Sequence, residues 1–381
     1  MLPSGADLNA AASTLRSNAS VASVDFVHYR ALADANDPRL NTDDQWYLYK
    51  ENTDPGAWNV SHGANGVSVA IIDTGVDETN QDFVFDVRES VINGTRLTGA
   101  GTAQDHDGHG TNVAGLAAAQ TNNGYGYAGV GYSTHVQAYK IFPDATSTTD
   151  CASANTSDEV AAINDAVSNG ASVISLSLGS AGTAANFDQQ EENAIEAAIA
   201  AGVTVVAAAG NSAASFLDYP AGYPGVIAVG ASAVTDTTAN SYASINAEVV
   251  ASYSNATPTL VAPGGDATND PKCGPGTGST CDYLHWIEGY GTRTPVNQSV
   301  ACTDQSATGV CGLLFNGTSQ ATPQVSGTVA LMEAYHGGAR SLTPAQVKSI
   351  LTSTTDVISG SAAYQGAGRL NAGKAVAAAH P

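Results

Sequence analysis

A continuous apolar run, Val67-Ser-Val-Ala-Ile-Ile72, leads directly into Asp73-Thr-Gly75. Its β-branched residues favour a strand that is buried on both faces, as the strands of a parallel sheet are. In open sheets of this kind, ligands bind at the carboxyl ends of the strands. The sequence therefore predicts a parallel sheet with Asp73 at the edge where a functional site would form.

Strand-like and helix-like segments alternate through the rest of the chain. Strands are expected at 136–141, 173–178, 203–208, 226–230 and 259–261, and helices at 110–119, 157–169, 188–201, 319–335 and 344–351. Gly170 and Gly202 follow two of these helices, as C-terminal caps do. This alternation predicts an α/β fold with three layers, α/β/α, around a mostly parallel central sheet.

The composition is that of a compact globular protein with an acidic surface. The 381 residues are 43% hydrophobic, and 35 acidic against 13 basic residues give a net charge of −22. No apolar run approaches the roughly 20 residues that span a membrane, and residues 1–7 show no signal peptide. The negative charge argues against a nucleic-acid partner. Solubility, salt tolerance, an acidic habitat and cationic substrates remain as interpretations of it.

Three short glycine-flanked motifs carry a carboxylate, an imidazole and a hydroxyl. They are Val69-Ala-Ile-Ile-Asp-Thr-Gly75, Asp107-Gly-His-Gly-Thr111 and Asn316-Gly-Thr-Ser-Gln-Ala-Thr-Pro323. A serine hydroxyl needs a base before it attacks a carbonyl, and His109 is the candidate, oriented by Asp73. Each residue alone also fits a structural role in a turn or a helix cap. Together they predict nucleophilic catalysis by Ser319.

A negatively charged intermediate of this chemistry needs hydrogen-bond donors. Ser319 is expected at the start of a helix, where backbone amides are unsatisfied and the helix dipole is positive. Asn211, in Ala207-Ala-Ala-Gly-Asn211 after an expected strand, is the second candidate donor. The same dipeptide also fits a common Gly-Asn turn.

These blocks resemble the motifs of the subtilisin-like serine proteases from about residue 36 to residue 379. The family's motifs Asp-[Ser/Thr]-Gly, His-Gly-Thr-His-Val-Ala-Gly and Gly-Thr-Ser-Met-Ala-x-Pro-His-Val correspond here to Asp73-Thr-Gly75, 109–115 and 317–325. The chain departs from them at Asn112, Gln320 and Gln324, none of which is in the expected triad. The resemblance implies an endopeptidase that forms an acyl-enzyme on Ser319.

The resemblance also implies where a peptide substrate would bind. An extended substrate would pair with the backbone of Ser177, Leu178 and Gly179, and the primary pocket would be walled by this segment and by residues that include Ala208 and Gly210. Small uncharged walls predict broad specificity with an uncharged or apolar side chain at P1. An esterase or acyltransferase with the same triad remains an alternative, as does an inactive proenzyme or binding relative.

Calcium is the cofactor that the resemblance implies, and no organic cofactor is expected. The loop 121–129 is similar to the family's calcium loop, and oxygen ligands suit a hard cation. The expected ligands are Asp82, Asn123 and the carbonyl groups of Thr121, Tyr125 and Tyr127, with Asp37 as a weaker candidate. An Asn-Gly turn without a metal is the alternative.

Residues 1–35 resemble the tail of the family's inhibitory propeptide, or are a simple extension, and 36–381 form the expected catalytic domain. Residues 266–314 are expected to be a Cys-rich loop or small insertion within it. Four cysteines lie there, Cys273, Cys281, Cys302 and Cys311, and their short spacings favour disulfides over a metal site, with Cys151 left over. Disulfides indicate an oxidising compartment. We therefore expect a secreted monomer that acts on peptides and its own propeptide, away from membranes.

Overall fold

The computed structural model describes the region that carries all of the expected catalytic residues. The described residues are 35–40, 43–63, 66–145, 153–236, 245, 247–270, 281–296, 304–305 and 310–381. The expected propeptide-like segment up to residue 34 lies outside them, as do Cys151, Cys273 and Cys302. No helix in these ranges is long and apolar enough to cross a membrane.

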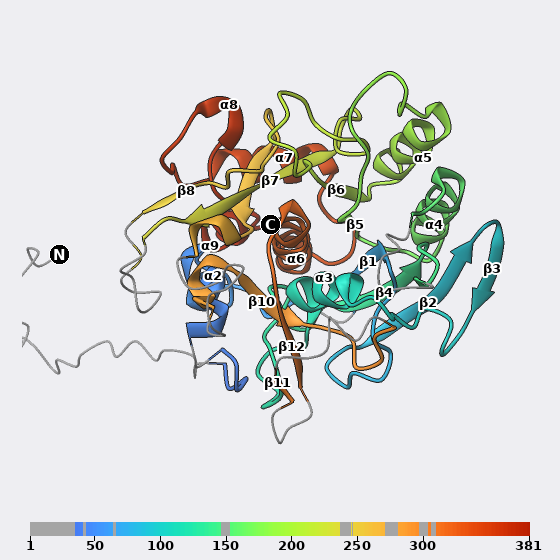
Figure 1. The fold of residues 1–381 in the computed structure, drawn as a ribbon, viewed down its shortest axis with the longest axis horizontal. Coiled ribbons are helices and arrows are strands. Elements are labelled where there is room, and N and C mark those ends of the chain that lie inside the picture. Colours follow the sequence, from blue (N-terminus) through green and yellow to red (C-terminus); the bar gives the residue numbers. More distant parts are fainter. Residues whose placement is uncertain are drawn as a thin grey trace, which may run out of the picture. The chain divides into compact units, whose positions relative to one another are not determined.

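A nine-stranded, mostly parallel sheet occupies the centre of the fold (Figure 1). Its strands are β1 (Ser68–Asp73), β2 (Phe85–Ile92), β3 (Thr95–Thr98), β4 (His135–Lys140), β5 (Val173–Leu176), β6 (Thr204–Ala208), β7 (Ile227–Val234), β8 (Glu248–Val250) and β9 (Leu260–Pro263). They run in the order β3-β2-β4-β1-β5-β6-β7-β8, and β9 pairs with β7. The β2–β3 and β7–β8 pairs are antiparallel and the other pairs are parallel.

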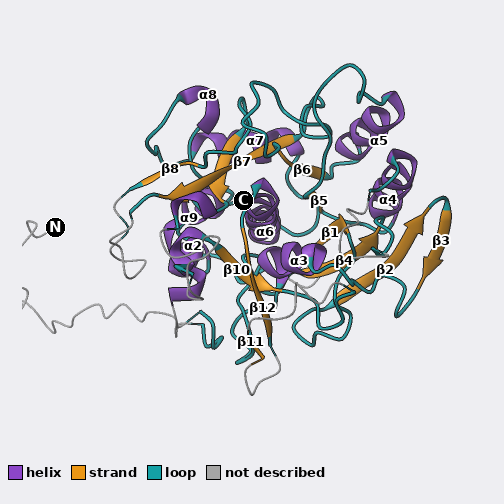
Figure 2. Ribbon diagram, in the orientation of Figure 1, coloured by secondary structure: helices purple, strands orange, loops and turns teal. Residues whose placement is uncertain are grey.

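Helices cover both faces of the sheet (Figure 2). The helices are α2 (Trp46–Lys50), α3 (His109–Ala118), α4 (Thr156–Ser168), α5 (Gln189–Ala200), α6 (Thr318–His336), α7 (Pro344–Ser353), α8 (Ala362–Gln365) and α9 (Ala372–Ala378). Short 3-10 or π turns occupy Asp43–Gln45, Thr53–Ala57, Ala267–Asn269 and Tyr283–His285.

Alternation along β1 explains the three layers. Val69 and Ile71 belong to the apolar cluster that contains residues of α3 and α6, whereas Ala70 and Ile72 belong to the cluster that contains residues of α4 and α5. Because successive side chains of a strand point to opposite faces, the continuous apolar run of β1 buries both faces of the sheet. The expected α/β/α fold is confirmed.

The segment 266–314 differs from the expected loop. It contains β10 (Ile287–Tyr290) and β11 (Asp304–Gln305), which pair antiparallel with β12 (Cys311–Phe315) in a separate three-stranded sheet. β10 and β12 each contain a glycine and β11 has only two residues, so their sequence shows little alternation. β2 and β3 were not expected either, because charged residues interrupt β2 and all four residues of β3 are exposed.

The packing of α6 on α3 generates a stability prediction. A Cβ atom on Gly327 would lie 2.6 Å from the carbonyl oxygen of Ala117 and 2.9 Å from Cβ of Val130. We therefore expect Gly327→Ala to lower the free energy of unfolding by about 1–3 kcal/mol, because overpacking forces the two helices apart. Urea unfolding measures this, with Ser349→Ala on the exposed side of α7 as a control. Equal stability of the two variants would contradict the close packing.

Candidate active site

The three expected catalytic residues lie at the ends of three regular elements. Asp73 is the last residue of β1, His109 the first of α3 and Ser319 the second of α6. The Nδ1 atom of His109 lies 2.8 Å from Oδ1 of Asp73, which is 1% exposed. Oδ1 of Asp73 also accepts a hydrogen bond from the amide of Thr74 at 2.7 Å. The carboxylate is thus held in a buried position from which it orients the imidazole.

The hydroxyl of Ser319 faces the backbone after β5. It donates to the carbonyl oxygen of Ser177 at 3.1 Å, and the hydroxyl of Ser177 donates to the carbonyl oxygen of Ser319 at 2.9 Å. Among the described residues, Ser319 and His109 share no hydrogen bond. Catalytic hydrogen bonds often tighten only when substrate is bound, so rotation of the Ser319 hydroxyl from Ser177 to His109 would complete the triad.

A side-chain contact between helices brings the first turns of α3 and α6 together. Nε2 of Gln320 donates to Oδ1 of Asn112 at 3.1 Å in a buried environment. Gln324 donates to the carbonyl oxygens of Gln320 and Pro263 at 2.8 and 2.6 Å. Buried hydrogen bonds therefore link the three positions that depart from the family's motifs.

Asn211 is oriented as an oxyanion donor. Its Oδ1 atom accepts hydrogen bonds from the amide and the hydroxyl of Thr318, both at 2.9 Å. This leaves the amide nitrogen free to donate, and that nitrogen lies 3.5 Å from an ideal Cβ position on Gly317. The amide of Ser319, in the first turn of α6, has no acceptor within its helix. Two donors can therefore serve the oxygen of a carbonyl that Ser319 attacks.

Sequence reasoning missed Asp105, a fully buried carboxylate that positions His109. Oδ1 of Asp105 accepts from the hydroxyl of Thr74 at 3.0 Å and from the amide of Gly108 at 3.0 Å. Oδ2 of Asp105 accepts from the hydroxyl of Thr111 at 2.5 Å. Asp105 thereby joins the end of β1 to the first turn of α3. Its contacts with Gly108 and Thr111 are local, but its contact with Thr74 spans 31 residues and required the fold.

The environment of His109 raises its pKa. Burial acts to lower the pKa, but the charge and hydrogen bond of Asp73, with the charges of Asp107 and Asp105, raise the pKa of His109 to about 9. Stabilisation of the imidazolium is what a base needs during attack, because that cation forms as Ser319 loses its proton.

The residues expected to bind substrate lie together after β5 and β6. The backbone groups of Gly179 form no hydrogen bond within the described part of the chain, and this residue is exposed. Gly210 faces Asp218, whose Oδ2 atom lies 2.4 Å from an ideal Cβ position on Gly210. The amide group of Asn255 donates to Oδ1 of Asp218 at 3.1 Å. Asp218 is an acidic group at the expected pocket wall that the sequence analysis did not consider.

The expected calcium loop is filled by a tyrosine from the Cys-rich segment. The hydroxyl of Tyr290 donates to Oδ2 of Asp82 at 2.5 Å and accepts from the amide of Tyr127 at 3.2 Å. Nδ2 of Asn123 donates to the other oxygen of Asp82, and burial raises the pKa of Asp82 to about 7. As placed, these groups do not fit an ion and the tyrosine hydroxyl at the same time.

The other candidate ligands differ in how far the protein already uses them. The carboxylate of Asp37 accepts from the amides of Asn122 and Asn123 at 2.7 and 3.3 Å. The carbonyl oxygens of Thr121, Tyr125 and Tyr127 accept no hydrogen bond within the described part of the chain. In the described ranges, no group of three or more His, Cys, Asp or Glu side chains is placed to hold a metal.

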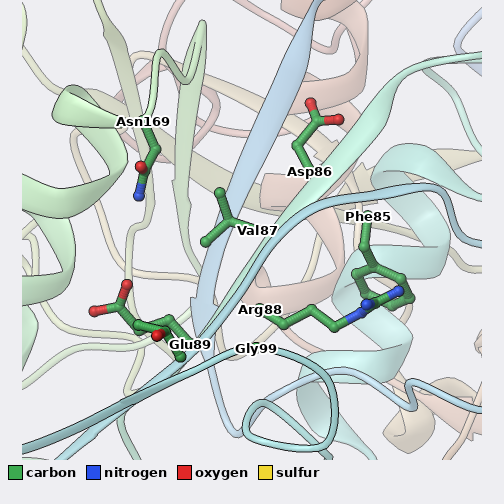
Figure 3. A pocket seen from close by; sticks show the side chains of 8 residues that line it. Phe85, Asp86, Val87, Arg88, Glu89, Gly99 and Asn169 are labelled. Atoms are coloured by element: carbon green, nitrogen blue, oxygen red, sulfur yellow. The ribbon is translucent and has the colours of Figure 1, made fainter.

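A pocket at the edge of the sheet contains none of the expected site residues (Figure 3). It is lined by Phe85, Asp86, Val87, Arg88, Glu89, Thr98, Gly99 and Asn169. Arg88 stacks over the ring of Phe85, 4.6 Å from its centroid. This pocket therefore lies apart from the expected catalytic residues.

Comparisons with known proteins agree with this geometry. A family model described as the subtilase family matches residues 64–369. Thermitase from Thermoactinomyces vulgaris is 31% identical over 343 residues, which cover 90% of this chain and 98% of thermitase. An extracellular protease from Xanthomonas campestris is 32% identical over 376 residues, covering 90% of this chain and 57% of that protein. A solved structure of a protease from Pseudoalteromonas arctica matches with a TM-score of 0.69 and 28% identity, covering 91% of this chain and 99% of its own.

The chain therefore belongs to the subtilase family. Within that family it is a subtilisin-like serine endopeptidase, as the relation to several serine proteases indicates.

The raised pKa of His109 predicts that the acidic side of the pH–activity curve lies at alkaline pH. His109 must be neutral to accept the serine proton, so we expect kcat/KM to rise with pH through about 9. Asp107→Asn removes one negative charge and should move this side of the curve to lower pH by about half a unit. pH profiles of peptide hydrolysis measure the shift. Glu196→Gln, on the exposed side of α5, removes the same charge far from the site and is the control. The same curve in all three proteins would contradict the assignment.

Tyr290 generates a second prediction. Tyr290→Phe removes a donor from the buried carboxylate of Asp82, so the free energy of unfolding should fall by about 1–3 kcal/mol. Thermal unfolding in EDTA measures this without a bound ion. Equal Tm values for the variant and the wild type would contradict a stabilising role of this hydrogen bond.

Proposed function

We propose that this endopeptidase cleaves extended or unfolded polypeptides through an acyl-enzyme on Ser319. The observation that carries the proposal is the meeting of the Asp73–His109 pair, Ser319 and Asn211 beside an exposed backbone segment that ends at Gly179. The unused hydrogen-bonding groups of Gly179 suit an added strand, because a peptide strand pairs through its main chain.

The mechanism follows from the roles of these groups. His109 takes the proton of Ser319 as the hydroxyl oxygen attacks the scissile carbonyl, and Asp73 stabilises the imidazolium. Asn211 and the amide of Ser319 donate hydrogen bonds to the oxyanion. The imidazolium then protonates the leaving amine, and water activated by His109 hydrolyses the ester. In acylation His109 passes the serine proton to the leaving amine, and in deacylation it passes a proton from water back to Ser319.

Specificity is part of the proposal. The small walls Ala208 and Gly210 favour broad cleavage after uncharged or apolar side chains. Asp218 is the nearby charge, and hydrogen bonds from Asn255 and from the backbone of Gly182 compensate it. Compensation by two donors weakens its attraction for a cation at P1.

Two other functions fit the triad less well. An esterase or acyltransferase would use the same nucleophile but would not need the exposed backbone of Gly179. An inactive relative would not need Asn211 to be oriented by Thr318 and Asp73 to be oriented against His109. The endopeptidase proposal accounts for all of these groups.

Secretion is also proposed, with disulfides and a removable N-terminal segment. Disulfides at Cys281 and Cys311 would suit an oxidising compartment. The Xanthomonas relative is named an extracellular protease. The pairing with Cys273 and Cys302, the propeptide role of residues 1–35 and the monomeric state stay predictions. Calcium binding likewise stays a prediction of the family resemblance.

Cleavage profiling tests the proposed function. The wild type should cut a proteome-derived peptide library mainly after uncharged residues, and Ser319→Ala should cut nothing. Asn211→Ala should lower kcat by about 100- to 1,000-fold with little change in KM, because its donor acts on the oxyanion. Mass spectrometry of the products measures both. Cleavage dominated by Lys or Arg at P1 would contradict the proposed specificity, and hydrolysis of short esters without peptide cleavage would contradict the endopeptidase itself.

A further inference from the structure

A cavity lies against the same backbone segment that is proposed to bind substrate. Leu178, Gly179 and Ser180 form one side of it, and Tyr219, Glu159 and Glu191 lie among the residues of the other sides. Ser177, next to Leu178, exchanges two hydrogen bonds with Ser319. Because an extended chain advances about 3.3 Å per residue, the cavity begins within about 10 Å of the nucleophile along this segment.

Two glutamates give the cavity an acidic wall. Glu159 on α4 is 5% exposed and Glu191 on α5 is 3% exposed. Tyr223 donates its hydroxyl to Oε2 of Glu191 at 2.7 Å. Oε1 of Glu159 is buried and has no hydrogen-bond donor. In the described part of the chain, neither glutamate forms an ion pair.

The two carboxyl groups of the acidic wall lie in contact with each other and have no cationic partner among the described residues. Burial raises the pKa of Glu159 well above its usual value, and the carboxyl group of Glu191 and the charge of Asp188 add to that shift. Burial raises the pKa of Glu191 as well. Two carboxyl groups in contact favour sharing one proton. The pair then keeps one negative charge and an unused acceptor, at a cost that a cation would offset.

The pair has a structural interpretation too, since a shared proton would join α4 to α5. A structural link between α4 and α5 does not explain why a cavity lies there, or why that cavity reaches the proposed substrate segment. Among the described residues that line the cavity, none is basic. The net charge of −22 also favours the approach of cationic chains.

We propose that this cavity receives a lysine or arginine side chain of the peptide substrate, held by Glu159 and Glu191. This inference rests on the proposed endopeptidase function, and it assigns a basic residue to one position of the peptide beside Ser177–Gly179. Side chains of a strand alternate between its two faces, so one such position should face the cavity while its neighbours do not.

Matched peptides test the inference. A set of fluorogenic peptides with a fixed uncharged P1 residue carries lysine, or its neutral analogue norleucine, at each of the other positions in turn. For the wild type, lysine should raise kcat/KM about tenfold or more at one position, as a charge-assisted hydrogen bond would. The gain should fall at high salt, and it should disappear in Glu159→Gln and Glu191→Gln but persist in Glu196→Gln on the exposed side of α5.

Three outcomes separate this inference from the function on which it rests. Equal gains in the wild type and in both glutamine variants, or no gain at any position, would overturn it. A gain lost in Asp218→Asn but kept in the glutamine variants would overturn it as well. Norleucine peptides cut normally by every variant show that the variants fold, and failure of the wild type to cut any peptide would overturn the proposed function instead. If a glutamine variant does not fold, the salt dependence of the wild-type gain decides alone, and a gain independent of salt would overturn the inference.

Discussion

The active site depends on one buried carboxylate that joins a strand to a helix. Asp105 accepts hydrogen bonds from Thr74, which follows the last residue of β1, and from Thr111 in the first turn of α3. Because Asp73 and His109 occupy those two elements, the distance between them is set by the contacts of Asp105. A buried carboxylate with this many donors is costly to disturb. The geometry of the base is therefore a property of the scaffold and not of His109 alone.

The Cys-rich segment supports this region from the opposite side. The hydroxyl of Thr292 donates to the carbonyl oxygen of Asp105 at 2.7 Å, and the amide of Val296 donates to the carbonyl oxygen of His106 at 2.9 Å. Tyr290, in the same segment, reaches Asp82. The Cys-rich segment thus contacts both the turn before His109 and the loop 121–129 that includes Tyr127. It is part of the structure that positions the site.

The sequence was sufficient for the features that local pattern determines. The continuous run before Asp73 predicted β1, and the alternation of segments predicted the layered sheet. The motifs also indicated the pairing of Asp73 with His109, whereas the hydrogen bond of Ser319 to Ser177 was not expected. Features that depend on distant neighbours could not be predicted in this way. The contact of Asp105 with Thr74 and that of Tyr290 with Asp82 required the fold. Asp218 lies outside the segments that were considered, and β2 is too polar to stand out. Asn112 and Gln320 were visible in the sequence as two separate departures from the family's motifs. That their side chains form a hydrogen bond could be seen only in the structure.

Stoichiometric labelling of the nucleophile tests the central claim most directly. After incubation with a sulfonyl fluoride, the intact mass of the enzyme and its peptide map are measured together with residual activity. The account predicts one adduct per chain, on Ser319, with activity lost in proportion and a labelling rate that rises as His109 loses its proton. An adduct on another residue, or full activity after Ser319 is labelled, would contradict it.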